Sequence, residues 1–327
     1  MVLTAGMIVA ALAFGAPQVD RGIELEHVVS LGTADGAGSL AGEPLAVRQD
    51  SRGRYYVVER SAATQVMVFA PTGQPAGTIG RRGQGPGEFR RLADLAIGEG
   101  DTLWALDRGA GQVSVFAPNW EYSRSFPAPG ARRLAVTPDG VVGLSGVFRE
   151  GNVTRSLMIV RREGPGLVSG AEVVLDPRFP PPAPPIAGSG VGVVWQALEG
   201  SYSVAIWSST GSRVAEIRVD SDRFRWPDEP STLLPGEPRG PLIHAIEVGR
   251  DGTLQVLLSS DERDSPLEFH HRLEYVDVGG NVVRSVAVAD GSYGFVAADL
   301  FFSYSEDAAG IPRIDIWRVH RSLSRRD

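Results

Sequence analysis

The stretch "GRRGQGPGEFRRLADLAIGEGDTLWALDRGAGQVSVF" (Gly80–Phe116) places four glycines and a proline in its first eight residues. A phosphate-binding loop of this composition needs Gly-Lys-Ser/Thr at the start of a helix, and a dinucleotide-binding loop needs a strand before it and a helix after it. Here the residues that follow, Leu92–Ile97 and Leu103–Leu106, have the pattern of strands. We therefore interpret the glycine loop as a connection between two pieces of sheet.

A repeated unit surrounds this loop. Glu43–Gln74 aligns with Ala93–Glu121, and both contain an apolar strand, a polar turn, a second strand and a third strand ending in Val-Phe-Ala-Pro. Looser copies begin near Arg132 and His244. An acidic residue followed by arginine ends the second strand of the two clear copies, as Glu59-Arg60 and Asp107-Arg108. Short strands broken by regular turns are typical of a sandwich, barrel or propeller.

The spacing of the repeats predicts six units. Their first strands are expected near Leu45, Leu95, Leu134, Val191, Ile246 and Phe295. The average unit of about 50 residues is somewhat longer than a compact propeller blade. Two proline-rich segments, Asp176–Gly190 and Asp220–Pro241, account for the excess and are predicted to be surface loops.

The two ends of the chain complement each other. The last unit has three strands, and an additional strand, Ile23–Gly32, precedes the first unit. The sequence therefore predicts an all-β, six-bladed β-propeller in which this N-terminal strand completes the last blade near Ile314–Val319. Residues 21–327 are expected to form this single domain, after a signal-like apolar segment at residues 1–20.

The glycine-loop unit resembles bacterial six-bladed β-propellers related to NHL-repeat proteins. The resemblance covers about Glu43–Phe126. It rests on a G-x-G-P-G-E-F linker and a later Asp and Val-x-Val-Phe strand, at Gly85, Pro86, Gly87, Glu88, Phe89, Asp107, Val113, Val115 and Phe116. It implies the propeller fold, and many proteins of this kind are exported without an assigned reaction.

Composition narrows the classes of function. A net charge of −7 and the lack of a basic tail argue against a nucleic-acid-binding protein, and there is no cysteine for a disulfide or a thiolate site. The apolar run Val2–Ala16 has the length of a signal-peptide core, although no basic residue precedes it. We expect a monomer exported to the periplasm or the extracellular space, without a membrane span in the mature chain.

Polar residues beside the cores of the predicted inner strands are candidates for a site at one mouth of the central channel. They are Glu43, Asp94, Arg132, Arg133 and His244. Some six-bladed propellers are metal-dependent lactonases or lyases, and such a ring could hold Ca²⁺, which prefers oxygen ligands. The alternative is that channel mouths are polar because the inner strands end in water. The two arginines would oppose a cation and suit a carboxylate or phosphate group.

Two further groups of charged residues need an interpretation. Arg81, Arg82, Arg90 and Arg91 bracket the glycine loop and are expected to form a solvated face neutralised by Glu88 and Asp94. Glu59 and Asp107 are expected to accept hydrogen bonds from backbone N–H groups within their blades. No catalytic constellation stands out. The sequence therefore favours a binding or interaction scaffold for a protein or a small anionic ligand, with a metal-dependent hydrolase or lyase as the alternative.

Overall fold

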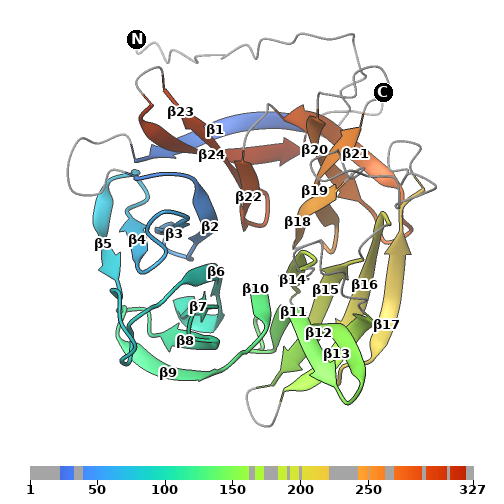
Figure 1. Ribbon diagram of the computed structural model, residues 1–327. Helices are drawn as coiled ribbons and strands as arrows, with labels where there is room; N and C mark the ends of the chain where they lie inside the picture. The colour runs from blue at the N-terminus through green and yellow to red at the C-terminus, as the bar shows by residue number, and fades with distance from the viewer. Residues whose placement is uncertain are drawn as a thin grey trace, which may run out of the picture.

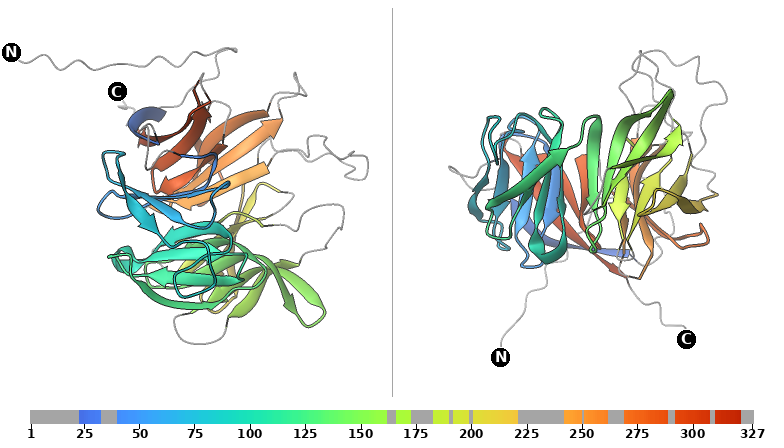
Figure 2. Two further views of the ribbon diagram at one scale, coloured as in Figure 1. Left: turned by 60° about the vertical axis from the view of Figure 1, so that its left-hand side comes forward. Right: turned by 90° about the horizontal axis from the view of Figure 1, so that it is seen from below.

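Six antiparallel four-stranded sheets form a ring in this protein, as Figure 1 shows. The computed structural model describes residues 23–32, 40–161, 166–172, 183–189, 192–198, 201–220, 242–249, 251–261, 269–288, 292–307 and 310–321. Seen from the side, the strands run roughly along the axis of the ring (Figure 2). The chain is therefore a six-bladed β-propeller, as the sequence predicts.

In the first five blades, four consecutive strands follow one another from the channel outward. Blade 1 contains β2 (Pro44–Gln49), β3 (Tyr55–Glu59), β4 (Val66–Phe69) and β5 (Pro75–Ile79). Blade 2 contains β6 (Leu92–Ile97), β7 (Leu103–Asp107), β8 (Gln112–Phe116) and β9 (Tyr122–Pro127), with the short 3₁₀ turn η1 (Glu99–Asp101) before β7. Blade 3 contains β10 (Ala131–Val136), β11 (Val142–Glu150), β12 (Val153–Val160) and β13 (Leu167–Glu172). Blade 4 contains β14 (Ile186–Gly188), β15 (Val193–Ala197), β16 (Ser203–Ser208) and β17 (Arg213–Arg218). Blade 5 is β18 (Leu242–Val248), β19 (Leu254–Asp261), β20 (Phe269–Val276) and β21 (Val282–Val288).

The sixth blade joins the two ends of the chain. It contains β22 (Ser292–Ala297), β23 (Leu300–Glu306), β24 (Pro312–Arg321) and, outermost, β1 (Ile23–Leu31). The predicted pairing is confirmed, with the register running from Ile23 opposite Arg321 to Leu31 opposite Ile314. The signal-like residues 1–20 lie outside the described residues. Within the described residues, no helix has the length and apolar character needed to cross a membrane.

The hydrophobic core is divided into six clusters, each between two neighbouring blades. Successive side chains in a strand point to opposite faces, so each strand supplies both of its neighbours. In β3, Tyr55 and Val57 pack toward blade 6, whereas Tyr56 and Val58 pack toward blade 2. Full burial of such side chains contributes about 1.5–3 kcal/mol each. The blades are therefore held together mainly by apolar faces.

The start of the fourth unit differs from the sequence prediction. Its inner strand is β14, which lies inside the segment predicted to be a surface loop, and the residues after Val191 form the second strand, β15. Gly188 explains why so short a strand packs here, because a Cβ on it would lie 2.7 Å from the carbonyl oxygen of Val136 in blade 3. Three residues next to prolines carry too little alternation to be recognised as a strand. Of the second predicted loop, residues 221–241 lie outside the described residues.

The glycine loop connects β5 of blade 1 to β6 of blade 2, as the sequence predicts. Its amide groups are occupied by a side chain of the same loop, because the Glu88 carboxylate accepts hydrogen bonds from the N–H groups of Gln84 at 3.0 Å and Gly85 at 2.9 Å. Gly87 has a φ of 74°, a conformation that favours glycine. The loop therefore binds its own carboxylate where a phosphate-binding loop would bind a ligand.

Candidate functional site

A cavity of about 680 Å³ lies along the channel axis and is lined by the innermost strand of every blade. All five residues that the sequence singled out line it, namely Glu43, Asp94, Arg132, Arg133 and His244. The residues predicted from the beginnings of the inner strands thus come from blades 1, 2, 3 and 5 and line one cavity. The cavity also contains polar residues that the sequence did not assign to the channel site, namely Arg48, Arg60, Glu247, His271 and Tyr293.

β-Bulges in the inner strands determine which side chains reach the cavity. The pairing register shifts between Leu92 and Asp94 in β6, and between Ala131 and Arg133 in β10. A bulge adds an unpaired residue and redirects the side chains beside it. Asp94 and Arg133 therefore occupy equivalent positions in adjacent strands.

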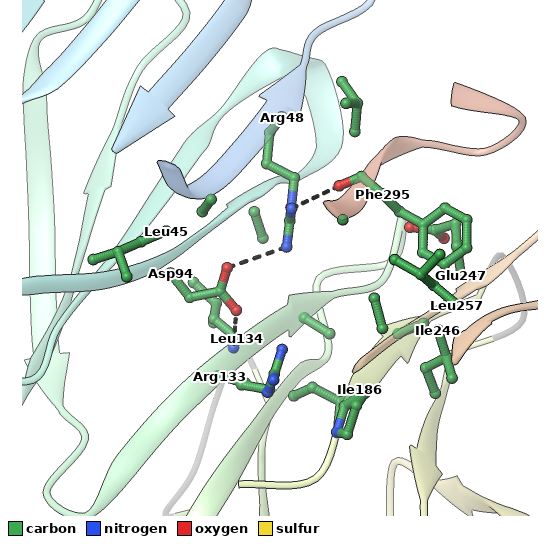
Figure 3. Close-up of a pocket in the computed structure, with 18 of the residues that line it drawn as sticks. Leu45, Arg48, Asp94, Arg133, Leu134, Ile186, Ile246, Glu247, Leu257 and Phe295 are labelled. Carbon is green, nitrogen blue, oxygen red and sulfur yellow. Dashed lines mark hydrogen bonds and ion pairs between the residues drawn. The ribbon is translucent and has the colours of Figure 1, made fainter. Parts of the chain in front are cut away.

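Arg48 and Asp94 form an ion pair that connects four blades (Figure 3). One terminal nitrogen of Arg48 lies 3.1 Å from Asp94 Oδ1, and the other donates to the carbonyl oxygen of Phe295 in blade 6 at 2.9 Å. The Asp94 carboxylate also accepts the N–H groups of Leu95 at 2.8 Å and of Leu134 in blade 3 at 2.9 Å. Asp94 is thus committed to protein partners, which gives it a structural role in the channel wall.

Arg133 has a different environment, although it is equivalent in position to Asp94. Its Nε donates to the carbonyl oxygen of Ala183 at 2.8 Å, and its two terminal nitrogens have no hydrogen-bond partner in the part of the chain that the structure describes. Burial lowers the pKa of Arg133, the Asp94 carboxylate opposes this effect, and Arg48 adds to it. An arginine nevertheless stays charged in a protein. Arg133 therefore presents a poorly solvated cation to the cavity.

Aromatic side chains from blades 5 and 6 line another part of the cavity. The rings of His244 and His271 have centroids 5.2 Å apart, and those of His271 and Tyr293 are 5.4 Å apart. His244 Nε2 lies 2.9 Å from the Ser259 hydroxyl. Burial, followed by the charges of His271 and Arg133, lowers the pKa of His244 from its usual 6.5 to about 4. His244 is therefore neutral at physiological pH.

Glu247 lies on β18, across the drawn pocket from Arg48 and Asp94 (Figure 3). Its Oε1 accepts the N–H of Val248 at 2.9 Å. Burial raises the pKa of Glu247, a hydrogen bond from Val248 and the charge of Arg48 oppose the rise, and Asp299 adds to it. Burial thus disfavours the charged form of this carboxyl group.

At the mouth where the inner strands begin, Glu43 is paired with Arg60, whose Nε lies 2.8 Å from Glu43 Oε2. Arg132 lies in the bulge before Arg133 and also lines the cavity. Among the described residues, no three His, Cys, Asp or Glu side chains are grouped so that they could hold a metal ion. The charged side chains that this structure gathers at the mouth are mostly arginines.

The expected neutralisation of the arginines around the glycine loop is confirmed for one residue and wrong for another. Glu88 is paired with Arg81 at 2.8 Å, as expected. Asp94 instead points into the channel and is paired with Arg48, because the bulge in β6 turns its side chain inward. The other arginines near the loop therefore do not have Asp94 as a counter-ion.

The expected role of Glu59 and Asp107 is confirmed. Glu59 Oε1 accepts the N–H groups of Ala41 at 2.5 Å and Gly42 at 3.1 Å. The Asp107 carboxylate, which is fully buried, accepts four backbone N–H groups at 2.7–3.1 Å, from Arg90, Arg91, Gly109 and Ala110. In both blades the acidic residue at the end of the second strand fixes the chain that enters the inner strand.

Comparison with known proteins agrees with this architecture. A family model described as a 6-bladed beta-propeller (DUF5128) matches residues 26–121, from within β1 to the turn before β9 of blade 2. No curated protein matches the chain significantly in sequence. The family model therefore covers the part of the chain in which the repeats are clearest.

Three solved structures are similar over nearly the whole chain. A protein from Bacteroides fragilis, named as a candidate exported protein, has a TM-score of 0.64 at 13% identity and covers 93% of this chain and 96% of its own. A DUF4221 family member from Bacteroides vulgatus has a TM-score of 0.58 at 10% identity, covering 93% and 100%. Virginiamycin B lyase from Staphylococcus aureus has a TM-score of 0.52 at 11% identity, covering 90% and 99%. These similarities establish the shared fold, and the role of this chain has to be inferred from its own site.

Proposed function

We propose that this chain is an exported propeller that binds a small anionic ligand, carrying a carboxylate or phosphate group, in its central channel. The observation that supports this proposal most directly is Arg133, whose terminal nitrogens face the cavity without a hydrogen-bond partner among the described residues. A guanidinium group with two adjacent N–H donors matches the geometry of these oxyanions.

The surroundings of Arg133 support an anion in preference to a cation. Asp94, the acidic residue nearest in position, is engaged by Arg48 and two backbone N–H groups. Burial raises the pKa of Glu247, which disfavours a negative charge at this position in the cavity. His244 and Tyr293 supply ring surface for the remainder of a ligand. The same features weigh against a metal-dependent hydrolase that would use Asp94 as a ligand.

Replacing Arg133 with glutamine tests the proposal. Small carboxylates and phosphates would be screened by thermal shift, and those that stabilise the protein would be measured by calorimetry with both variants. We expect Arg133→Gln to weaken binding at least tenfold, because a charge-assisted hydrogen bond in a poorly solvated site is worth about 1.5–3 kcal/mol. Arg133→Lys should recover only part of the affinity, since an ammonium group cannot form the paired contact.

A matched control comes from the outer edge of blade 4. Arg213 on β17 is exposed and paired with Glu216 at 3.0 Å, so Arg213→Gln removes the same charge far from the channel. This variant should bind anions like the unmodified protein. Equal affinities in Arg133→Gln and the unmodified protein, or no stabilisation by any carboxylate or phosphate, would contradict the channel proposal.

A further inference from the structure

Three arginines that have no carboxylate partner among the described residues lie together at the channel mouth where the inner strands begin. Arg91 immediately precedes β6, Arg108 immediately follows β7, and Arg132 lies in the bulge of β10. None of the three forms an ion pair in the part of the chain that the structure describes, unlike Arg60 at the same mouth, which is paired with Glu43. We refer to Arg91, Arg108 and Arg132 as the arginine rim.

The backbone fixes two members of the arginine rim beside each other. The Asp107 carboxylate accepts the Arg91 N–H at 2.9 Å, and the Gly109 N–H donates to the carbonyl oxygen of Arg91 at 3.3 Å. Gly109 leaves no room between the two segments, because a Cβ on it would lie 2.9 Å from the Cβ of Arg91. Arg108 is next to Gly109 in sequence. The contacts of Gly109 and Asp107 with the backbone of Arg91 therefore hold the backbone of Arg108 close to that of Arg91.

The charges of the arginine rim act on one another. Burial lowers the pKa of Arg108, and the neighbouring charges of Arg91, Arg132 and Arg60 lower it further. Two acidic groups at this end of the blades already have other partners, since Glu43 is paired with Arg60 and the Asp107 carboxylate accepts four backbone N–H groups. Positive charges gathered in this way attract anions to the mouth.

The arginine rim is continuous with the channel. Arg132 lines the cavity itself and is followed in β10 by Arg133, the residue that carries the proposed function. The cavity thus has a cation within it and further cations at its entrance. A ligand with a single anionic group would use only the first of these.

We propose that the arginine rim is a second anion subsite, and that the channel ligand is an elongated molecule with at least two oxyanion groups. This inference rests on the proposed function, because Arg133 binds one group inside the channel while Arg91, Arg108 and Arg132 bind another at the mouth. Phosphate, sulfate and carboxylate groups share the chemistry that guanidinium groups recognise.

The test compares probes that carry one anionic group with probes that carry several. Calorimetry would measure inorganic phosphate against tripolyphosphate, and acetate against citrate, so that the phosphate and carboxylate arms distinguish the two chemistries. An exposed ion pair strengthens binding by about two- to fivefold. We therefore expect the multivalent probe of at least one arm to bind about tenfold more tightly than its single-group counterpart.

The double variant Arg91→Gln/Arg108→Gln isolates the arginine rim. Both side chains are exposed, and the backbone hydrogen bond from the Arg91 N–H to Asp107 remains. We expect this variant to reduce the advantage of the multivalent probe to about twofold while leaving the single-group probe within about twofold of its original affinity. Arg213→Gln/Arg218→Gln, which removes the same charge from the outer strand β17, should change neither.

The possible results separate the two proposals. Loss of all anion binding in Arg133→Gln, with no multivalent advantage in the unmodified protein, would overturn the second subsite and leave the channel site standing. A multivalent advantage that survives Arg91→Gln/Arg108→Gln would also overturn it. Binding that depends on the arginine rim but is unchanged in Arg133→Gln would instead contradict the channel site, and with it the two-point ligand. The absence of binding by every probe would contradict both.

Discussion

Asp94 and Arg133 occupy equivalent positions in neighbouring inner strands, yet their side chains have opposite roles. The Asp94 carboxylate is neutralised by Arg48 and two amide groups, so it holds the channel wall together. Among the described residues, Arg133 donates a hydrogen bond only from its Nε. A charged residue at a repeated position is therefore not sufficient to identify a binding group. The deciding property is which of its hydrogen-bonding atoms have no partner within the folded protein.

His244 provides a prediction about pH at the scale of a single residue. Its pKa is lowered from 6.5 to about 4 in the folded protein, so the unfolded chain binds a proton between these values and the folded chain does not. The stability that comes from keeping His244 neutral is complete above pH 6.5 and is lost as the pH falls toward 4. The full shift corresponds to at most about 3 kcal/mol, at about 1.4 kcal/mol per pKa unit.

Chemical denaturation at several pH values between 7 and 4.5 would test this. We expect the unmodified protein to lose stability as the pH falls, and His244→Gln to lose less, since glutamine can still contact the Ser259 hydroxyl without titrating. His320→Gln removes a histidine that is exposed on β24 and paired with Glu26, and it serves as a control that should retain the loss of stability caused by His244. Identical pH profiles for His244→Gln and the unmodified protein would show that His244 is not held neutral.

At the scale of the element, the segments that lead into the inner strands of blades 1 and 2 are held by acidic side chains. Asp107 and Glu59 end the second strands of blades 2 and 1, and their carboxylates fix the segments that lead into β6 and β2. This contact sets where the inner strand begins and, through the adjoining bulge, which side chains face the channel. A small acidic side chain outside the cavity thereby positions the residues within it.

We predict that Asp107→Ala destabilises the protein more than Glu59→Ala does. The first substitution removes the partner of four backbone N–H groups and the second that of two. Buried donors left without a partner cost about 1–3 kcal/mol each, and water relieves part of this cost, so we expect losses of about 2–4 and 1–2 kcal/mol in urea denaturation. Asp277→Ala, in an exposed turn, should cost less than either. The reverse order would contradict the anchoring role of Asp107.

The elements also show what the sequence could predict and what it could not. Strand number, closure by Ile23–Gly32 and the structural use of Glu59 and Asp107 follow from local repeats and turn signals. The strand β14 was missed because three residues beside prolines show no alternation. Arg48 was missed because its partner Asp94 lies 46 residues away, and only the bulge in β6 turns that carboxylate toward it. Local pattern therefore locates the channel wall but not the contacts across it.

The whole molecule is a ring whose closure depends on β1. This strand covers the outer edge of β24, and Leu31 is fully buried in the cluster between blades 6 and 1. His27 and Ser30 on β1 both contact the Asp315 carboxylate on β24. Any processing of the N-terminal segment must consequently leave residues from Ile23 onward in place.

This constraint sharpens the export part of our proposal. The apolar run Val2–Ala16 ends only a few residues before β1, so a signal peptidase would have to cut between them. We expect mass spectrometry of the protein from its native host to show a mature N-terminus within residues 17–22. A cytosolic species that retains Met1 would remove the localisation claim, and a terminus beyond Ile23 would conflict with the closed ring.

The pairing of β1 with β24 also has a consequence for the order in which the chain is synthesised. The ribosome makes β1 before any blade, but its partner emerges last, with 288 residues between His27 and Asp315. At elongation rates of about 5–20 residues per second, this interval is about 15–60 seconds. Throughout that time an unpaired strand with apolar side chains is tethered to the growing chain, and it is able to associate with the wrong sheet edge. The strand that completes the sixth blade of the finished ring thus leaves the nascent chain with an unpaired segment until its final strand has been synthesised.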